Sequence, residues 1–204
     1  MCHFQETLWT EDSECKKMPV NTAVVSDIMK IGGGVANLEE FLSILDIPPL
    51  SSNIYQKELN NIATSWEKVA ENEMYCTAME EKHLAVQAGG DGIPMLTVVV
   101  DGCWAKRSYR INYSSLSGTA TIVGFQTKKV LYMAVQNRYC MVCSRAAAVN
   151  KLPGKYCCSK NLHGSSTSME ANIIQERFRN SVAMYGVKYA KVIGDGDTTF
   201  TKLY

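Results

Sequence analysis

Two stretches of the chain place aspartates where they could bind a divalent metal ion. The apolar run Met95–Val100 leads directly into Asp101 and Gly102, and a second run that starts at Tyr189 leads into Asp195 and another glycine. Apolar, β-branched runs of this length are typical of strands buried on both faces. Carboxylates are ligands that hard cations prefer. We therefore expect two strands to end on Asp101 and Asp195 at one sheet edge and to hold a divalent ion between them.

A second group of residues has the spacing of a zinc site. Cys140 and Cys143 form a CxxC pair, 13 residues separate Cys143 from the adjacent Cys157 and Cys158, and His163 follows five residues after Cys158. Zinc takes four nitrogen or sulfur ligands in a tetrahedron, and a CxxC turn supplies two of them. We expect Cys140, Cys143 and Cys158 to bind zinc in a structural site, with Cys157 or His163 as the fourth ligand. The alternative is a set of buried free thiols.

Charge divides the chain into two parts. Residues 1–92 carry 15 acidic and 6 basic side chains, whereas residues 93–204 carry 15 basic and only 5 acidic ones. A basic part that keeps a few acids at strand ends suits an enzyme that grips phosphates and positions metal ions. An ordinary solvated surface is the alternative interpretation of the same charges.

Composition narrows the class of protein. A hydrophobic content of 46% with only five prolines fits a folded protein of one sizeable domain, or of one domain with an appendage. No apolar run has the length that spans a bilayer, so we expect no membrane segment. The N-terminus lacks a basic segment followed by an apolar one, so eight cysteines indicate a reducing compartment and argue against a secreted disulfide protein.

The first part of the chain predicts helices. We expect a disordered lead-in over residues 1–19 and then a helical appendage over residues 20–92. Its helices are predicted over residues 22–29, which Gly32–Gly34 would end, 37–45, and 52 to about 86. Three helices joined by tight turns also resemble a helix-turn-helix, with residues 51–62 as the reading helix, but this segment is acidic. A helical appendage that packs on a catalytic domain is the interpretation we favour.

The second part predicts strands. Beyond the Asp101 strand, the pattern predicts strands over residues 117–124 and 130–135, a cysteine-rich loop, a helix over residues 166–185, and the Asp195 strand. The resulting α/β (α+β) order β-β-β-α-β, with acids at the ends of the first and fourth strands, is typical of the first part of a ribonuclease H-like fold. We therefore expect an incomplete ribonuclease H-like core with a cysteine-rich zinc-knuckle insertion.

Several runs of residues resemble one known family. These are residues 19–25, the run from Val98 to Tyr109, and the segments 113–118, 137–140, 161–170 and 193–197. Together they resemble the Mutator-like transposase domain of arthropod mobile elements, and the likeness covers most of the chain. Several matches at the right spacing make the resemblance specific, which no single match would be.

The resemblance implies a DDE-type recombinase that cleaves and joins DNA with two divalent ions, Mg²⁺ or Mn²⁺, held by three carboxylates. Asp101 matches the first carboxylate and Asp195 the second, and Asp197 assists or caps the next turn. Glu170 lies in a matching segment, and we assign it a structural or substrate-positioning role. DNA is the implied partner, a homo-oligomer is a further possibility, and the nucleus is the implied location.

Basic residues near these acids are candidates for phosphate contacts. Lys106, Arg107 and Arg110 follow Asp101 closely, and Lys128 and Lys129 could extend a basic track. Contacts of this kind give affinity that depends on salt and not on base sequence. For any single one of them, a solvated surface position is the alternative.

The sequence departs from the family pattern in two places. The family has a His two residues before the cysteine that corresponds to Cys158, and this chain has Tyr156 there. The family's third carboxylate follows a further helix and strand, so we expect the core over residues 93–204 to be truncated and its triad to be incomplete. On that expectation the chain alone is inactive, and the alternative is a non-catalytic DNA- or protein-binding relic that a zinc knuckle stabilises.

Overall fold

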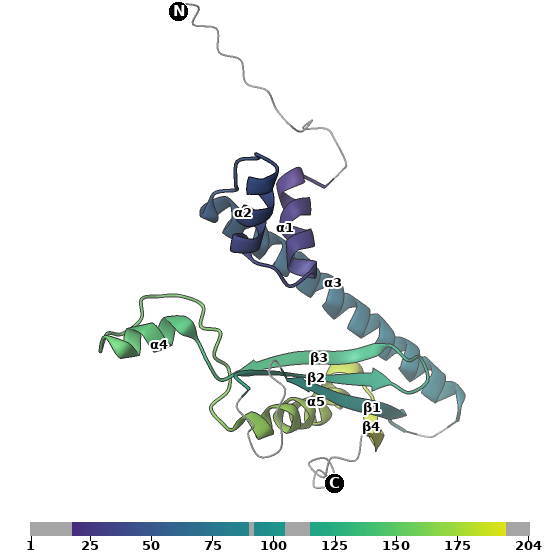
Figure 1. Ribbon diagram of the computed structural model, residues 1–204. Helices are drawn as coiled ribbons and strands as arrows, with labels where there is room; N and C mark the ends of the chain where they lie inside the picture. Colours follow the sequence, from purple (N-terminus) through teal and green to yellow (C-terminus); the bar gives the residue numbers. More distant parts are fainter. Residues whose placement is uncertain (1–17, 90–91, 105–114, 195–204) are drawn as a thin grey trace, which may run out of the picture. The chain divides into compact units, whose positions relative to one another are not determined.

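The computed structural model describes residues 18–89, 92–104 and 115–194, apart from the side chain of residue 167 (Figure 1). Its helices are α1 (Val20–Lys30), α2 (Val35–Ile44), α3 (Ser52–Gln87), α4 (Met141–Ala148) and α5 (Met169–Tyr185), and a short 3-10 turn, η1 (Ser166–Ser168), precedes α5. Its strands are β1 (Met95–Trp104), β2 (Ser117–Gly124), β3 (Val130–Asn137) and β4 (Lys188–Ile193). Nearly all of the predicted lead-in lies outside the described residues.

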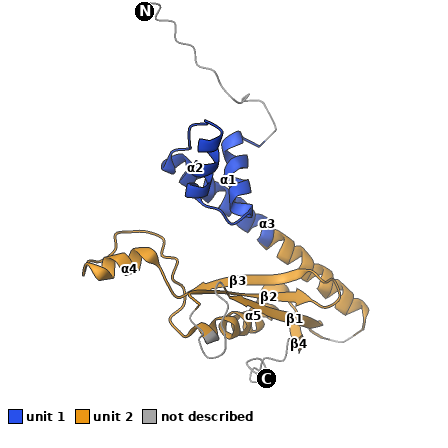
Figure 2. Cartoon of the chain, viewed as in Figure 1, with its two compact units in different colours: residues 1–70 blue, residues 71–204 orange. Residues whose placement is uncertain are grey.

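The chain forms two compact units that divide between Ala70 and Glu71 (Figure 2). The division falls within α3, whereas the sequence analysis placed the boundary after this helix, at residue 92. The reason is that Ala78 and Ala85, in the second half of α3, belong with the apolar cluster of the sheet. None of the helices in the described ranges combines the length and the apolar character of a transmembrane helix.

The first unit is a helical bundle with its own apolar cluster. Val25 of α1, Leu38 and Leu42 of α2, and Tyr55 and Ile62 of α3 are all buried in it. The predicted glycine stop is confirmed: α1 ends at Lys30, and Gly32 follows in the turn with a φ of 75°, which favours a residue without a Cβ. The Ser51 hydroxyl accepts a hydrogen bond from the backbone N–H of Ile54 and so caps α3.

The second unit contains one four-stranded sheet in the order β3-β2-β1-β4. β1, β2 and β3 pair antiparallel in sequence, and β4 pairs parallel with β1 after a crossover that contains α5. A parallel pair needs such a crossover, because a tight turn can join only antiparallel neighbours. The predicted four strands with a helix before the last are found, and a further helix, α4, lies between β3 and α5.

One face of the sheet carries the core. Val98 and Val100 of β1, Ala120 and Ile122 of β2, and Ile173 of α5 are buried together. Side chains alternate along a strand, so Thr97, Val99 and Asp101 lie on the other face. Because Thr97 and Val99 are half-buried and Asp101 is exposed, the prediction of a β1 buried on both faces is wrong.

A buried carboxylate ties the second half of α3 to the sheet. Glu81 is only 1% exposed, and its Oε1 accepts hydrogen bonds from the backbone N–H groups of Gln126, at 3.0 Å, and Thr127, at 2.7 Å. The carboxylate lies directly against Gly124, where a Cβ would come within 2.3 Å of it. Glu81 thus satisfies the donors of the β2–β3 turn, and a glycine makes the close approach possible.

Candidate metal centres

Asp101 lies within β1 and not at its end. The strand continues to Trp104, because pairing with β2 extends through Asp101 opposite Thr121 and on to Trp104 opposite Gly118. The prediction that the strand stops at Asp101 is therefore wrong. The Thr121 hydroxyl donates to the main-chain oxygen of Asp101 at 3.2 Å, so the backbone that carries this exposed carboxylate is held on the β2 side.

The pairing of β1 with β4 fixes the register of the two strands that precede the aspartates in the sequence. The parallel ladder pairs Thr97 with Lys191 and ends at Val99 opposite Ile193. Asp101 follows Val99 by two residues, and in the sequence Asp195 follows Ile193 by two residues. Asp195 and Asp197 themselves lie outside the described residues.

Glu170 is a second acid near Asp101, but it belongs to the covered face of the sheet. It lies in the first turn of α5, and its carboxylate occupies the space where a Cβ on Gly102 would be, 2.3 Å from the carboxyl carbon. Asp101 and Gly102 are adjacent in the strand, so their side-chain positions lie on opposite faces. This arrangement fits the structural role that the sequence analysis assigned to Glu170.

The candidate DNA-binding residues divide into two groups. Lys106, Arg107 and Arg110 lie outside the described residues. Lys128 and Lys129 lie in the turn after β2, with the Lys128 ammonium 3.9 Å from the centre of the Phe125 ring. Lys129 forms an ion pair of 2.7 Å with Glu80, and the pKa of Lys129 is raised by this hydrogen bond and charge.

The cysteine-rich segment leaves the sheet after β3 and returns to the same point. The side chain of Asn161 accepts from the backbone N–H of Asn137 at 2.6 Å and donates to the carbonyl of Val135 at 2.9 Å. The backbone N–H groups of Asn161 and Leu162 both donate to the carbonyl of Asn137. These bonds close the base of the segment on the end of β3, so residues 138–160 form a distinct excursion from the sheet.

The excursion is not the loop that the sequence predicted, because it contains α4. Cys140 precedes this helix in an extended conformation, and Cys143 is its third residue. The sequence after the CxxC pair, with three consecutive alanines, consists of strong helix formers. The helix fixes the spacing of the first two thiols.

Three of the predicted zinc ligands come together. The sulfur atoms of Cys140, Cys143 and Cys158 all lie within 4.8 Å of one another, and those of Cys143 and Cys158 are 3.7 Å apart. Cys157 and His163 are exposed and are not part of this group. Instead, the hydroxyl of Tyr156 lies 3.1 Å from the Cys140 sulfur and 2.7 Å from that of Cys143.

These contacts change the acidity of the thiols. Hydrogen bonds from the Tyr156 hydroxyl and from the backbone N–H of Cys143 lower the pKa of Cys140 from its ordinary value of 9.0 to about 5. The hydrogen bond from Tyr156 lowers the pKa of Cys143. The nearby Cys158 thiol and desolvation raise this pKa by more, so the pKa of Cys143 is raised. The same sulfurs raise the pKa of Tyr156. These contacts favour the Cys140 thiolate, which is the form that binds metal.

The donor set fits a metal ion. Zinc–sulfur bonds of about 2.3 Å in a tetrahedron place neighbouring sulfurs about 3.8 Å apart. The Cys143–Cys158 separation of 3.7 Å has this length. The three thiols of Cys140, Cys143 and Cys158 could therefore hold a metal ion. Sequence reasoning found all three, but it missed Tyr156 beside them.

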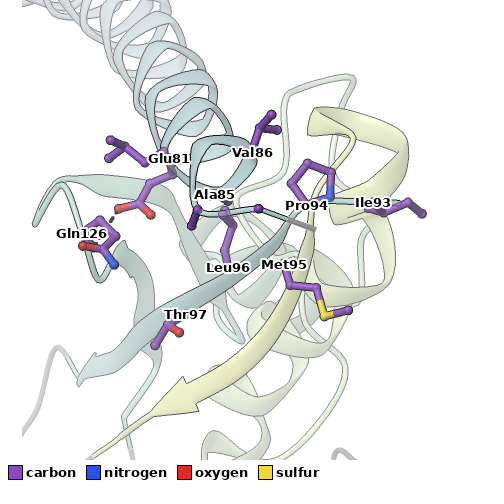
Figure 3. Close-up of a pocket in the computed structure, with 12 residues that line it drawn as sticks. Glu81, Ala85, Val86, Ile93, Pro94, Met95, Leu96, Thr97 and Gln126 are labelled. Carbon is purple, nitrogen blue, oxygen red and sulfur yellow. Dashed lines mark hydrogen bonds between the residues drawn. The ribbon is translucent and has the colours of Figure 1, made fainter. Parts of the chain in front are cut away.

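A cavity in the described part is lined by residues of neither candidate centre (Figure 3). It measures about 490 Å³ and is lined by the end of α3, the start of β1 and Gln126. Figure 3 shows the Glu81 carboxylate directed at the β2–β3 turn, where its hydrogen bonds are already made. The cavity contains neither Asp101 nor a cysteine, so we assign it no catalytic role.

Comparison with known protein families identifies one that matches this chain. A family model described as Mutator-like transposase matches residues 1–203. No curated protein and no solved structure matches the chain. The family match covers the helical unit, the sheet and the cysteine segment alike, so the chain belongs to the Mutator-like transposase family.

Proposed function

We propose that this chain carries part of a DDE-type active site on a ribonuclease H-like core, in which Asp101 and Asp195 hold divalent ions for DNA cleavage and strand transfer. The observation that carries the proposal is the parallel register, in which Val99 pairs with Ile193. Asp101 follows Val99 by two residues, and in the sequence Asp195 follows Ile193 by the same number. Membership of a transposase family supports the same chemistry.

In this proposal, bound Mg²⁺ or Mn²⁺ activates the attacking oxygen and stabilises the leaving oxygen in an in-line displacement at phosphorus. The contribution of the chain is to hold carboxylates at fixed positions. Asp101 suits this role because its pairing with Thr121 of β2 restricts its backbone, while its side chain stays exposed to a substrate. Asp197 assists Asp195, and Lys106, Arg107 and Arg110 contact DNA phosphates beside the acids.

We further propose that zinc is the metal of the cysteine cluster and that its role is structural. Thiolates select zinc over the harder Mg²⁺ and Mn²⁺, which prefer oxygen. The cluster also lies on the excursion that Asn161 closes, and Asp101 is absent from it. Zinc there would fix α4 relative to residues 156–158 and would not take part in phosphoryl transfer.

The DNA-cleavage proposal is tested by nicking of a supercoiled plasmid with Mg²⁺ or Mn²⁺. Nicking that requires the metal and is lost in Asp101→Asn and Asp195→Asn, each of which removes the charge of a metal ligand, would support the proposal. Asp27→Asn is the matched control, since Asp27 is a 74% exposed acid of the helical unit. Nicking that survives Asp101→Asn would contradict the proposal.

A second function, a DNA- or protein-binding relic without catalysis, is favoured by one observation. The three-thiol cluster forms without any contribution from the aspartates. Metal-independent, salt-sensitive DNA binding with no nicking would support this alternative. In either case we propose nuclear localisation and self-association on DNA, which fluorescence microscopy and sedimentation of the DNA complex would test.

A further inference from the structure

The hydroxyl of Tyr156 caps the three-thiol cluster. It lies 2.7 Å from the sulfur of Cys143 and 3.1 Å from that of Cys140, and the sulfur of Cys158 lies 3.7 Å from that of Cys143. The oxygen therefore lies against the group that the three sulfurs form. Three donors with a fourth above them form the corners of a distorted tetrahedron, which is the coordination that zinc requires.

The dimensions of this tetrahedron are close to those of a metal site. With zinc–sulfur bonds of about 2.3 Å and a zinc–oxygen bond of about 2.0 Å, the oxygen would lie about 3.5 Å from each sulfur. The observed separations are shorter, because hydrogen bonds take the place of metal bonds. If the Tyr156 oxygen moved away from the three sulfurs by less than about 1 Å, a zinc ion would fit between the oxygen and the sulfurs.

The two fourth ligands that the sequence suggested are placed less well. His163 follows Leu162, which is 7% exposed and whose backbone N–H is bonded to the carbonyl of Asn137. His163 is therefore held at the base of the excursion, by the end of β3. Cys157 is exposed, and its sulfur is not within the group that Cys140, Cys143 and Cys158 form.

We propose that Tyr156 supplies the fourth ligand, so that the site is of the Cys₃Tyr type. The inference rests on the zinc site proposed above and identifies the fourth ligand of that site. Tyr156 would supply its phenolic oxygen as the fourth donor beside the three sulfurs. A filled fourth position excludes water from the metal, which is the property of a structural and not a catalytic zinc site.

The experiment is titration of the full chain with Zn²⁺ and Co²⁺ under reducing conditions. We expect one ion per chain and a tetrahedral Co²⁺ spectrum that does not respond to added imidazole, since Tyr156 closes the site. Tyr156→Phe should bind zinc on the order of tenfold or more weakly and should respond to imidazole, because its fourth position is open. Tyr156→His should regain the affinity with a Cys₃His spectrum.

Cys157→Ser and His163→Ala are the matched controls and should leave affinity and spectrum unchanged. Loss of affinity in either control, or equal affinity of Tyr156→Phe and the unaltered chain, would overturn the assignment of Tyr156 while the zinc site itself stands. Absence of metal binding in the unaltered chain would overturn the zinc site and the assignment together. Circular dichroism of the metal-free variants verifies that each one folds.

Discussion

At the scale of single residues, a carboxylate packs directly against the backbone of a glycine. The carboxylate of Glu170 fills the position beside Gly102 that any other residue would need for its Cβ. The pair links the start of α5 to the middle of β1, directly after the proposed catalytic Asp101. Gly102 is thus required for a close approach and not for a turn.

We expect Gly102→Ala to force the Glu170 carboxylate out of its place. In a double-mutant cycle on the free energy of unfolding in urea, Gly102→Ala and Glu170→Ala should show a coupling of about 1 kcal/mol or more. Gly154→Ala is the control, because no atom lies within 4 Å of its Cβ position, and it should show no coupling with Glu170→Ala. Independent effects of Gly102→Ala and Glu170→Ala would contradict the contact.

At the scale of the elements, α3 is attached to the sheet by a carboxylate as well as by apolar packing. Glu80 and Glu81 are neighbours on this helix with opposite environments. Glu80 forms an exposed ion pair with Lys129, whereas Glu81 is buried and satisfies two backbone donors of the β2–β3 turn. The difference makes them a matched pair for a test.

We expect Glu81→Ala to reduce the free energy of unfolding by about 1–3 kcal/mol, because it leaves two turn N–H groups without an acceptor. Glu80→Ala should change it by less than about 1 kcal/mol, since an exposed ion pair contributes little. Urea denaturation followed by circular dichroism measures both. Equal effects of the two substitutions would show that the turn does not depend on Glu81.

At the scale of the whole molecule, the cysteine excursion is separable from the sheet. Asn161 closes its base on β3, and the apolar cluster of the sheet contains no residue from the range 138–160. A metal in the cluster should therefore order the excursion without supporting the core. The helical unit likewise has an apolar cluster of its own.

Removal of the metal with a chelator should accordingly act locally. We expect amide hydrogen exchange to accelerate in α4 and residues 156–158 while β1 and β2 keep their protection, because their hydrogen bonds and packing are unaffected. Hydrogen-exchange mass spectrometry of the loaded and the chelated protein measures this. Loss of protection throughout β1 and β2 would mean that the metal supports the whole second unit.

Sequence patterns by themselves determined the elements. Helical periodicity and glycine stops predicted α1 to α3 and α5, and β-branched runs predicted the four strands within a few residues, because these signals are local. The CxxC spacing of Cys140 and Cys143 likewise identified a metal-binding segment. The helix α4 was missed, because the CxxC pair was interpreted as a turn although the alanines after it favour a helix.

Only the tertiary structure decided which residues meet. Tyr156 lies beside the thiols, Glu170 lies against Gly102, and Val99 pairs with Ile193. Even the extent of β1 beyond Asp101 was set by its pairing with β2. These outcomes depend on sheet register and helix packing between segments distant in the chain, and local propensities do not encode them. The sequence therefore indicated which residue types could bind metal ions, and the tertiary structure decided which of them lie in contact.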